Sequence, residues 1–298
     1  MPGTSLRPWS YTTSTGITLR GFETAITGKP LVHFLHGTGF NGLVYWPMLR
    51  HLLPHVDMVI TNAQGHGGSD AGKKFLGWQA NAAMIHDVLL HKKSQWGNAG
   101  VIGMGHSFGA IVTLLIANQQ PSVFDRLLLL DPIFLPPVLS MLSHVFRHTG
   151  LVELTPMVKM TRKRRAHWPD RDAVRNSLYQ HGVFRGWHDE AFDAYLEHAL
   201  YEREDGMHLV TAPDLEADVF AGYAAGMSRV IRQLQQPCHM IRGDRTFAYV
   251  KTGLARACRL NHRVTQETMP GAHCFMLQHP QAVAERIVQR LRETGVIP

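Results

Sequence analysis

V-I-G-M-G-H-S-F-G, residues 101–109, is the stretch that decides the fold, and an apolar segment of helical length follows it at 110–117. An apolar strand that runs straight into a helix forces a sharp, strained reversal at Ser107. Gly105 and Gly109 lie two residues before and after Ser107, where a Cβ atom would collide as strand and helix close on each other. The serine hydroxyl is then raised above the sheet edge, beside a helix N-terminus whose free N–H groups favour negative charge. Because a chain with 27 glycines can contain G-x-S-x-G by chance, this motif needs partners elsewhere.

Composition narrows the class of protein. A hydrophobic content of 45% with 18% charged residues is typical of a globular protein with a packed core. The first ten residues carry no apolar run after their charge, so we expect no secretory signal, and no apolar stretch is long enough to insert into a membrane. Cys238, Cys258 and Cys274 lack paired spacing, which favours reduced thiols in a cytoplasmic protein.

Basic residues give a net charge of +7, and most of them are scattered along the chain. The one cluster, K-M-T-R-K-R-R at 159–165, has no interleaved aromatic residues and belongs to no nucleic-acid-binding motif. We interpret it as a solvated helix face and expect no nucleic-acid partner; contact with anionic substrates is the lesser alternative.

The chain contains 19 histidines, which raises the question of a metal site. It has no H-E-x-x-H and no C-x-x-C motif. His51 and His55, and likewise His144 and His148, have helical spacing, but nothing nearby completes a ligand set. The sequence therefore predicts no metal site.

Strands and helices are predicted to alternate through most of the chain. A hairpin is expected at 9–25, and helices at 45–53, 75–96, 219–235 and 280–294. Further strands are expected at 31–35, 56–60, 101–106, 126–130, 237–243 and 262–269. This alternation predicts an α/β fold, with a mostly parallel sheet that has helices on both faces.

The character of the chain changes after Pro136. Up to about Asp218 it is more polar and rich in aromatic residues, and it contains no run typical of a buried strand. We therefore predict a core of residues 1–135 and 219–298, and a helical cap at 136–218. Caps exclude water and shape a pocket over a sheet edge.

A second glycine-rich turn, H-G-T-G at 36–39, follows the buried strand at 31–35. A loop at the carboxyl end of a central strand can direct backbone N–H groups into the crevice where open α/β sheets bind ligands. The Thr38 amide is a candidate donor to an oxyanion, with the Phe108 amide as the second, which is the arrangement that acyl transfer needs.

The chain resembles the α/β-hydrolase superfamily over nearly its full length. The resemblance rests on five motifs in order, each at a predicted strand end: H-G-T-G (36–39), Q-G-H-G-G-S-D (64–70), G-H-S-F-G (105–109), L-L-L-D-P (128–132) and M-P-G-A-H (269–273). It implies an eight-stranded, mostly parallel sheet with a helical cap. It also implies Ser107 as nucleophile, His273 as general base, and the Thr38 and Phe108 amides as oxyanion hole.

The acid of this triad departs from the commonest pattern of the superfamily. That pattern places the acid three residues after the glycine that ends the penultimate strand, and here Thr246 holds the position. A minority of relatives place it after the strand that follows the nucleophile, where this chain has Asp131. We favour Asp131, with Asp244 as the alternative.

A serine at the reversal favours acyl transfer over the dehalogenase and epoxide hydrolase chemistry that needs a carboxylate nucleophile. We therefore expect a hydrolase of small to medium acyl or aryl esters that needs no cofactor. A C–C bond hydrolase, a thioesterase, a lactonase and a catalytically idle ligand-binding fold are the alternatives; the oligomeric state is not predicted. The expected pocket is lined in part by His36, Gly37, Phe40, Ile133 and Phe134.

Overall fold

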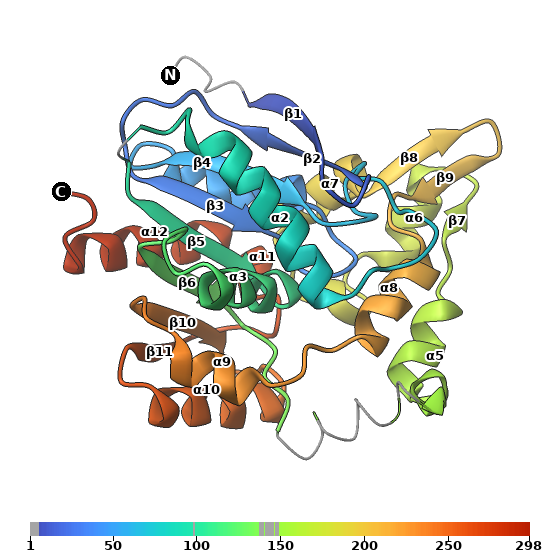
Figure 1. The fold of residues 1–298 in the computed structure, drawn as a ribbon. Helices are drawn as coiled ribbons and strands as arrows, with labels where there is room; N and C mark the ends of the chain where they lie inside the picture. Colours follow the sequence, from blue (N-terminus) through green and yellow to red (C-terminus); the bar gives the residue numbers. More distant parts are fainter. Residues whose placement is uncertain (1–5, 98, 137–139, 141–145, 147–148) are drawn as a thin grey trace.

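The computed structural model describes residues 6–97, 99–136, 140, 146 and 149–298 (Figure 1). His144 and His148, parts of the predicted cap and the first five residues lie outside this range. Eight strands form one sheet in the order β1-β2-β4-β3-β5-β6-β10-β11. The strands β1 and β2 are antiparallel to their neighbours, and β3, β4, β5, β6, β10 and β11 pair in parallel. The mostly parallel, eight-stranded sheet is therefore confirmed.

The strands lie close to the predicted positions. They are β1 (Arg7–Thr12), β2 (Thr18–Glu23), β3 (Leu31–Leu35), β4 (Asp57–Asn62), β5 (Val101–His106), β6 (Arg126–Leu130), β10 (Cys238–Gly243) and β11 (Val264–Met269). In β3, Leu31 and Leu35 pack into one hydrophobic cluster, whereas Val32 and Phe34 pack into another. A strand buried on both faces favours apolar residues on both sides, which explains its apolar character; the one polar residue, the buried His33, bonds to the Thr61 hydroxyl.

Helices cover both faces of the sheet. One layer holds α2 (Trp78–Lys93), α3 (Phe108–Gln119), α9 (Met227–Gln233) and α10 (Ala248–Leu260). The other holds α1 (Trp46–Leu49), α11 (Phe275–Gln278) and α12 (Pro280–Glu293), and two short 3₁₀ turns, Gly42–Tyr45 and Arg50–Leu52, flank α1. No helix in the described part of the chain is both long and apolar enough to cross a membrane.

The segment expected to be an all-helical cap contains a second sheet. Its elements are α5 (Pro156–Arg162), β7 (His167–Trp168), α6 (Arg171–Leu178), α7 (Asp189–His198), β8 (Leu200–Arg203), β9 (Gly206–Leu209) and α8 (Pro213–Ala221), with 3₁₀ turns at Leu151–Leu154 and Gly182–Phe184. The antiparallel strands β7, β9 and β8 form a three-stranded sheet, which we call the cap sheet. Figure 1 shows the cap sheet with α5, α6 and α8 on one side of the large sheet.

Two details of the prediction were wrong in this region. Short, mostly exposed strands such as β8 give no apolar run, so the cap sheet was missed. The single helix expected at 219–235 is two helices, because the chain turns between α8 and α9 and Gly226 there has a φ of 77°. The predicted boundary at residue 218 falls inside α8, and the division into core and cap stays a prediction.

Candidate active site

The reversal between β5 and α3 holds Ser107 in a strained conformation. Its φ is 53°, a value that residues other than glycine rarely adopt. A Cβ atom on Gly105 would lie 2.6 Å from the Gly109 backbone, and one on Gly109 would lie 2.2 Å from the carbonyl oxygen of Leu35. The sequence therefore needs glycine at both positions, and the second contact presses the start of α3 against the end of β3.

Three side chains from distant parts of the chain form a continuous hydrogen-bonded series. His273 Nε2 lies 3.0 Å from Ser107 Oγ, and His273 Nδ1 lies 2.6 Å from Asp131 Oδ2. A carboxylate only accepts hydrogen bonds, so Nδ1 carries the proton of the neutral ring. Nε2 is then the acceptor that faces the Ser107 hydroxyl, which is the arrangement needed to remove its proton.

Asp131 is held rigidly at the end of β6. It is fully buried, has a φ of 42°, and accepts a hydrogen bond from the Gly243 amide at 3.0 Å. The Thr246 hydroxyl also donates to its Oδ2. The sequence excludes Thr246 as the acid and assigns it no other role. In the structure, the Thr246 hydroxyl donates a hydrogen bond to Asp131. The sequence signal that could have revealed this contact was the position of Thr246, three residues after Gly243.

Asp244 lies elsewhere. Its Oδ1 accepts a hydrogen bond from the Gly271 amide at 2.8 Å, and it lies 3.6 Å from Arg245. The Gly271 hydrogen bond is the main reason that the pKa of Asp244 is below its ordinary value. The structure therefore brings Asp131 to His273, while Asp244 holds the loop that carries His273.

Two of the four amides in the H-G-T-G loop, and that of the next residue, donate to acceptors that fix the loop. Gly37 donates to Tyr45 Oη at 3.1 Å, Gly39 donates to His66 Nε2 at 3.2 Å, and Phe40 donates to the Gly37 carbonyl at 3.3 Å. Within the described residues, no group accepts a hydrogen bond from the Thr38 amide. The same holds for the amide of Phe108, the first residue of α3.

Two buried histidines support this loop. His36 donates from Nδ1 to the Gly37 carbonyl at 2.8 Å and accepts from the Ala63 amide at 3.0 Å. His66 donates from Nδ1 to the Gln64 carbonyl at 2.9 Å. Burial lowers the pKa of His36 to about 3 and that of His66 to about 4. Both rings are therefore neutral near pH 7 and serve as fixed hydrogen-bonding groups.

A third buried histidine, His106, connects the loop to the backbone of His273. Its Nε2 donates to the His273 carbonyl at 3.1 Å, and its Nδ1 accepts from Tyr45 Oη at 2.6 Å. Burial, followed by the nearby His273, puts the pKa of His106 well below its ordinary value. A Cβ atom on Gly37 would lie 2.6 Å from His106 Nδ1. Sequence patterns gave no sign of this series, because its members are far apart in the chain.

The predicted pocket residues lie in other surroundings. His36 and Gly37 are buried within the loop contacts described above, and the Phe40 ring packs on Trp187 with centroids 5.4 Å apart. Phe134 lines a separate cavity beside α9 and α10, and the Ile133 carbonyl accepts a hydrogen bond from Tyr223. None of these five residues lines the cavity beside His273, and the expected lining of the substrate pocket stays a prediction.

A cavity of about 630 Å³ opens beside His273. The Phe247 ring, 45% exposed, lies 5.2 Å from the His273 ring, centroid to centroid. Val183 adds an apolar wall, and Arg185 and Arg245 bring positive charge. The complete lining is Gly182, Val183, Arg185, Gly186, Arg245, Thr246, Phe247, Ala272, His273, Cys274 and Gln278.

An ion pair between the buried Glu216 and the partly exposed Arg164 lies against the H-G-T-G loop. Glu216 Oε1 would be 2.6 Å from a Cβ atom on Gly39, and Glu216 Oε2 accepts from Arg164 at 2.7 Å. Burial raises the pKa of Glu216, and Arg164 opposes that rise. Arg162 bonds to Glu153 and Asp218. The basic cluster is therefore bound in part to acidic groups of the chain itself, whereas the sequence suggested a solvated face.

Comparison with known proteins identifies a family and related structures. A family model described as "Alpha/beta hydrolase family" matches residues 34–286. Among curated proteins, Lipase LipV of Mycobacterium tuberculosis (strain ATCC 25618 / H37Rv) is 30% identical over 106 residues, covering 36% of this chain and 38% of the lipase. 2-(Acetamidomethylene)succinate hydrolase of Mesorhizobium japonicum (strain LMG 29417 / CECT 9101 / MAFF 303099) is 22% identical, covering 83% of this chain and 82% of that protein.

A solved structure shares the fold. The crystal structure of E-2-(acetamidomethylene)succinate hydrolase superposes with a TM-score of 0.76 at 19% identity, covering 96% of this chain and 98% of that one. The lipase match spans well under half of either protein, so it identifies a relationship and no substrate. On the family match and the shared fold, this chain belongs to the alpha/beta hydrolase family.

Proposed function

We propose that this hydrolase cleaves carboxylic esters of small to medium acyl or aryl groups through an acyl-enzyme intermediate. The observation that carries the proposal is the series Ser107 Oγ, His273 Nε2 and Nδ1, and Asp131 Oδ2. A serine hydroxyl becomes nucleophilic when an imidazole removes its proton, and a buried carboxylate fixes that imidazole and stabilises its charge.

The reaction would take place in two steps. Ser107 Oγ attacks the ester carbonyl while His273 takes its proton; the C–O bond then breaks and His273 returns the proton to the leaving alcohol. Water, activated by His273 in the same way, releases the acid from Ser107. The Thr38 and Phe108 amides are proposed as the donors to the oxyanion in both steps, because no group in the described residues accepts a hydrogen bond from either of them.

The cavity beside His273 favours a compact substrate. Its volume of about 630 Å³ suits a ligand of modest size, and Phe247 and Val183 offer apolar contact for an acyl or aryl group. A C–C bond hydrolase, a thioesterase and a lactonase would use the same three residues. Thioester and lactone probes therefore belong in the first test.

Hydrolysis of p-nitrophenyl esters of increasing acyl length tests the proposal. We expect turnover of the short and medium esters and a loss of about 10³-fold or more in kcat for Ser107→Ala with its fold unchanged. Absence of turnover for every ester, thioester and lactone would contradict it, and so would a Ser107→Ala variant as active as the parent.

An ester that bears a free carboxylate is a second candidate substrate class. Arg185 and Arg245 both line the cavity, and the full-length relative is named for a succinate derivative. Arg185→Gln and Arg245→Gln should raise KM for p-nitrophenyl hemiglutarate about tenfold and leave p-nitrophenyl butyrate within about twofold. Equal effects on both esters would remove this candidate and leave the neutral ester proposal intact.

A further inference from the structure

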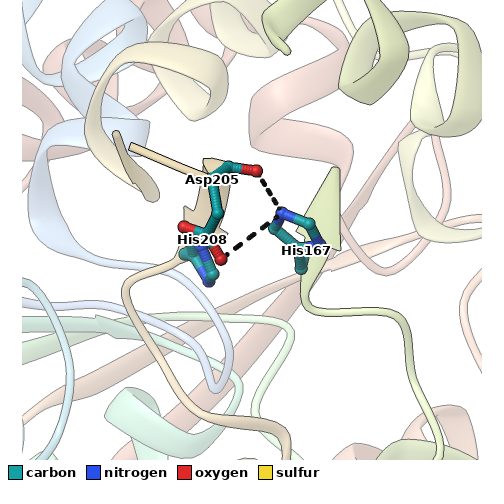
Figure 2. Close-up of side chains that lie close together, drawn as sticks. All are labelled: His167, Asp205 and His208. Carbon is teal, nitrogen blue, oxygen red and sulfur yellow. Dashed lines mark hydrogen bonds and ion pairs between the residues drawn. The ribbon is translucent and has the colours of Figure 1, made fainter. Parts of the chain in front are cut away.

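The cap sheet gathers three side chains of metal-ligating types on its surface, none of which belongs to the Ser107 site. They are His167 of β7, His208 of β9 and Asp205 of the turn between β8 and β9 (Figure 2). One ligand atom from each lies within 4.8 Å of the other two. No other such group of three occurs among the residues that the structure describes.

Both imidazoles are directed at Asp205. His167 Nε2 lies 2.7 Å from the Asp205 carbonyl oxygen and 3.8 Å from its Oδ2, as Figure 2 shows. His208 Nε2 lies 2.8 Å from Asp205 Oδ1. The two imidazole rings are 4.6 Å apart, centroid to centroid. Two nitrogens and one carboxylate oxygen therefore surround a single small volume.

The backbone fixes these positions. His167 and His208 are direct partners in the antiparallel register, so their side chains leave the same face of the cap sheet. The next pair places Trp168, which is buried, on the opposite face. Gly206, with a φ of 125°, leaves no room for a Cβ atom beside the Trp168 carbonyl, and this holds the turn that carries Asp205.

We propose that His167, Asp205 and His208 bind one divalent transition-metal ion of the zinc type. Two imidazole nitrogens with one carboxylate oxygen are a donor set that Zn²⁺ takes, with water filling the remaining position. Each neutral ring binds through Nε2 after its proton moves to Nδ1. The ion then replaces the hydrogen bonds that now converge on Asp205, and it ties the two-residue strand β7 to the β8–β9 hairpin.

Calorimetric titration of tag-free, EDTA-treated full-length protein with ZnCl₂ tests the site. We expect one ion per chain with a micromolar dissociation constant. His167→Gln, His208→Gln and Asp205→Asn should each weaken binding at least about tenfold, since each removes a ligand. His262→Gln and Cys258→Ser are the matched controls for an exposed imidazole and an accessible thiol, and should bind as the parent does.

Hydrogen exchange gives a readout that does not depend on activity. Zn²⁺ should slow exchange of the amides in β7 and at the β8–β9 turn in the parent and leave it unchanged in His208→Gln. All variants should keep the far-ultraviolet spectrum and the esterase rate of the parent. Absence of stoichiometric Zn²⁺ binding would overturn the proposal; so would full binding by His167→Gln and His208→Gln, or an equal loss in the two controls.

Discussion

Histidines in two regions of this molecule lie in opposite surroundings. Beneath the edge of the large sheet, four of them have no exposed surface: His33, His36, His66 and His106. On the cap sheet, the side chains of His167 and His208 are 48% and 19% exposed. Burial makes the first group neutral hydrogen-bonding parts of the scaffold, whereas the second group lies at the surface and bonds to Asp205.

His273 is about as exposed as His208 and differs from it in its partner. Its side chain is 18% exposed, and it is paired with the fully buried Asp131. It is close enough to solvent to reach a substrate, yet a carboxylate fixes its orientation. Histidine therefore serves as a structural hydrogen-bonding group, as the proposed base or as a proposed metal ligand. Its burial and its partners determine which of these roles it takes.

The sharpest test of His273's special position concerns its carboxylate partner. Asp131→Asn should lower kcat about 10³–10⁴-fold, because an amide no longer fixes the tautomer or stabilises the imidazolium. Asp244→Asn should change kcat less than about twofold, because Asp244 bonds to the Gly271 amide instead. Esterase kinetics on both purified variants decide this, and the reverse ranking would move the acid to Asp244.

A buried and an exposed histidine should differ strongly in their contribution to stability. His106→Ala removes a fully buried ring and leaves the Tyr45 hydroxyl and the His273 carbonyl without their partner, so we expect a loss of about 2–4 kcal/mol in the free energy of unfolding. His262→Ala, at an exposed site, should stay within about 0.5 kcal/mol. Urea unfolding measures both, and equal losses would contradict the distinction.

The buried His106 ring leaves no room for a side chain at Gly37. Gly37→Ala would place a Cβ atom 2.6 Å from His106 Nδ1 and 3.0 Å from Tyr45 Oη. We expect a destabilisation of about 1–3 kcal/mol from this overpacking. Gly100→Ala is the control, since its Cβ atom would make only an ordinary contact at 3.4 Å, and thermal unfolding of the pair should separate them. A Gly37→Ala variant as stable as Gly100→Ala would show that the site relaxes freely.

The smallest predicted effect is the change in the free energy of unfolding with pH. Burial lowers the pKa of His33 and of His36 from 6.5 to about 3, and that of His66 to about 4. The unfolded chain then binds more protons than the folded chain between these values, so stability rises with pH across that window and levels off above about pH 7.5.

His106 belongs with these three rings. When the pH falls from about 7.5 to about 6.5, protonation of the four rings in the unfolded chain should lower the free energy of unfolding by about 1–2 kcal/mol. Little change from this source is expected between about pH 8.5 and 7.5. Urea unfolding at the three pH values checks the slope. A stability that increases on acidification through this window would mean that the rings are not held neutral.

Much of the core was predictable because its signals are local. Apolar runs predicted the central parallel strands, and the reversal at Ser107 followed from a strand that runs directly into a helix between Gly105 and Gly109. The resemblance to the α/β-hydrolase superfamily implied His273 as base and favoured Asp131 over Asp244 as its partner. The roles of Thr246 and Glu216 were not predictable, because each depends on a contact with a residue that is distant in sequence. The cap sheet was missed because β7 and β8 are too short for a periodic pattern. The cytoplasmic location stays a prediction.

Covalent labelling tests the central proposal most directly. We predict that a fluorophosphonate forms one adduct per chain, that peptide mass spectrometry places it on Ser107, and that His273→Ala slows its formation by orders of magnitude. A protein that stays unlabelled, that carries the adduct on another residue, or that reacts equally fast without His273 would contradict the assignment of Ser107 as nucleophile and His273 as its base.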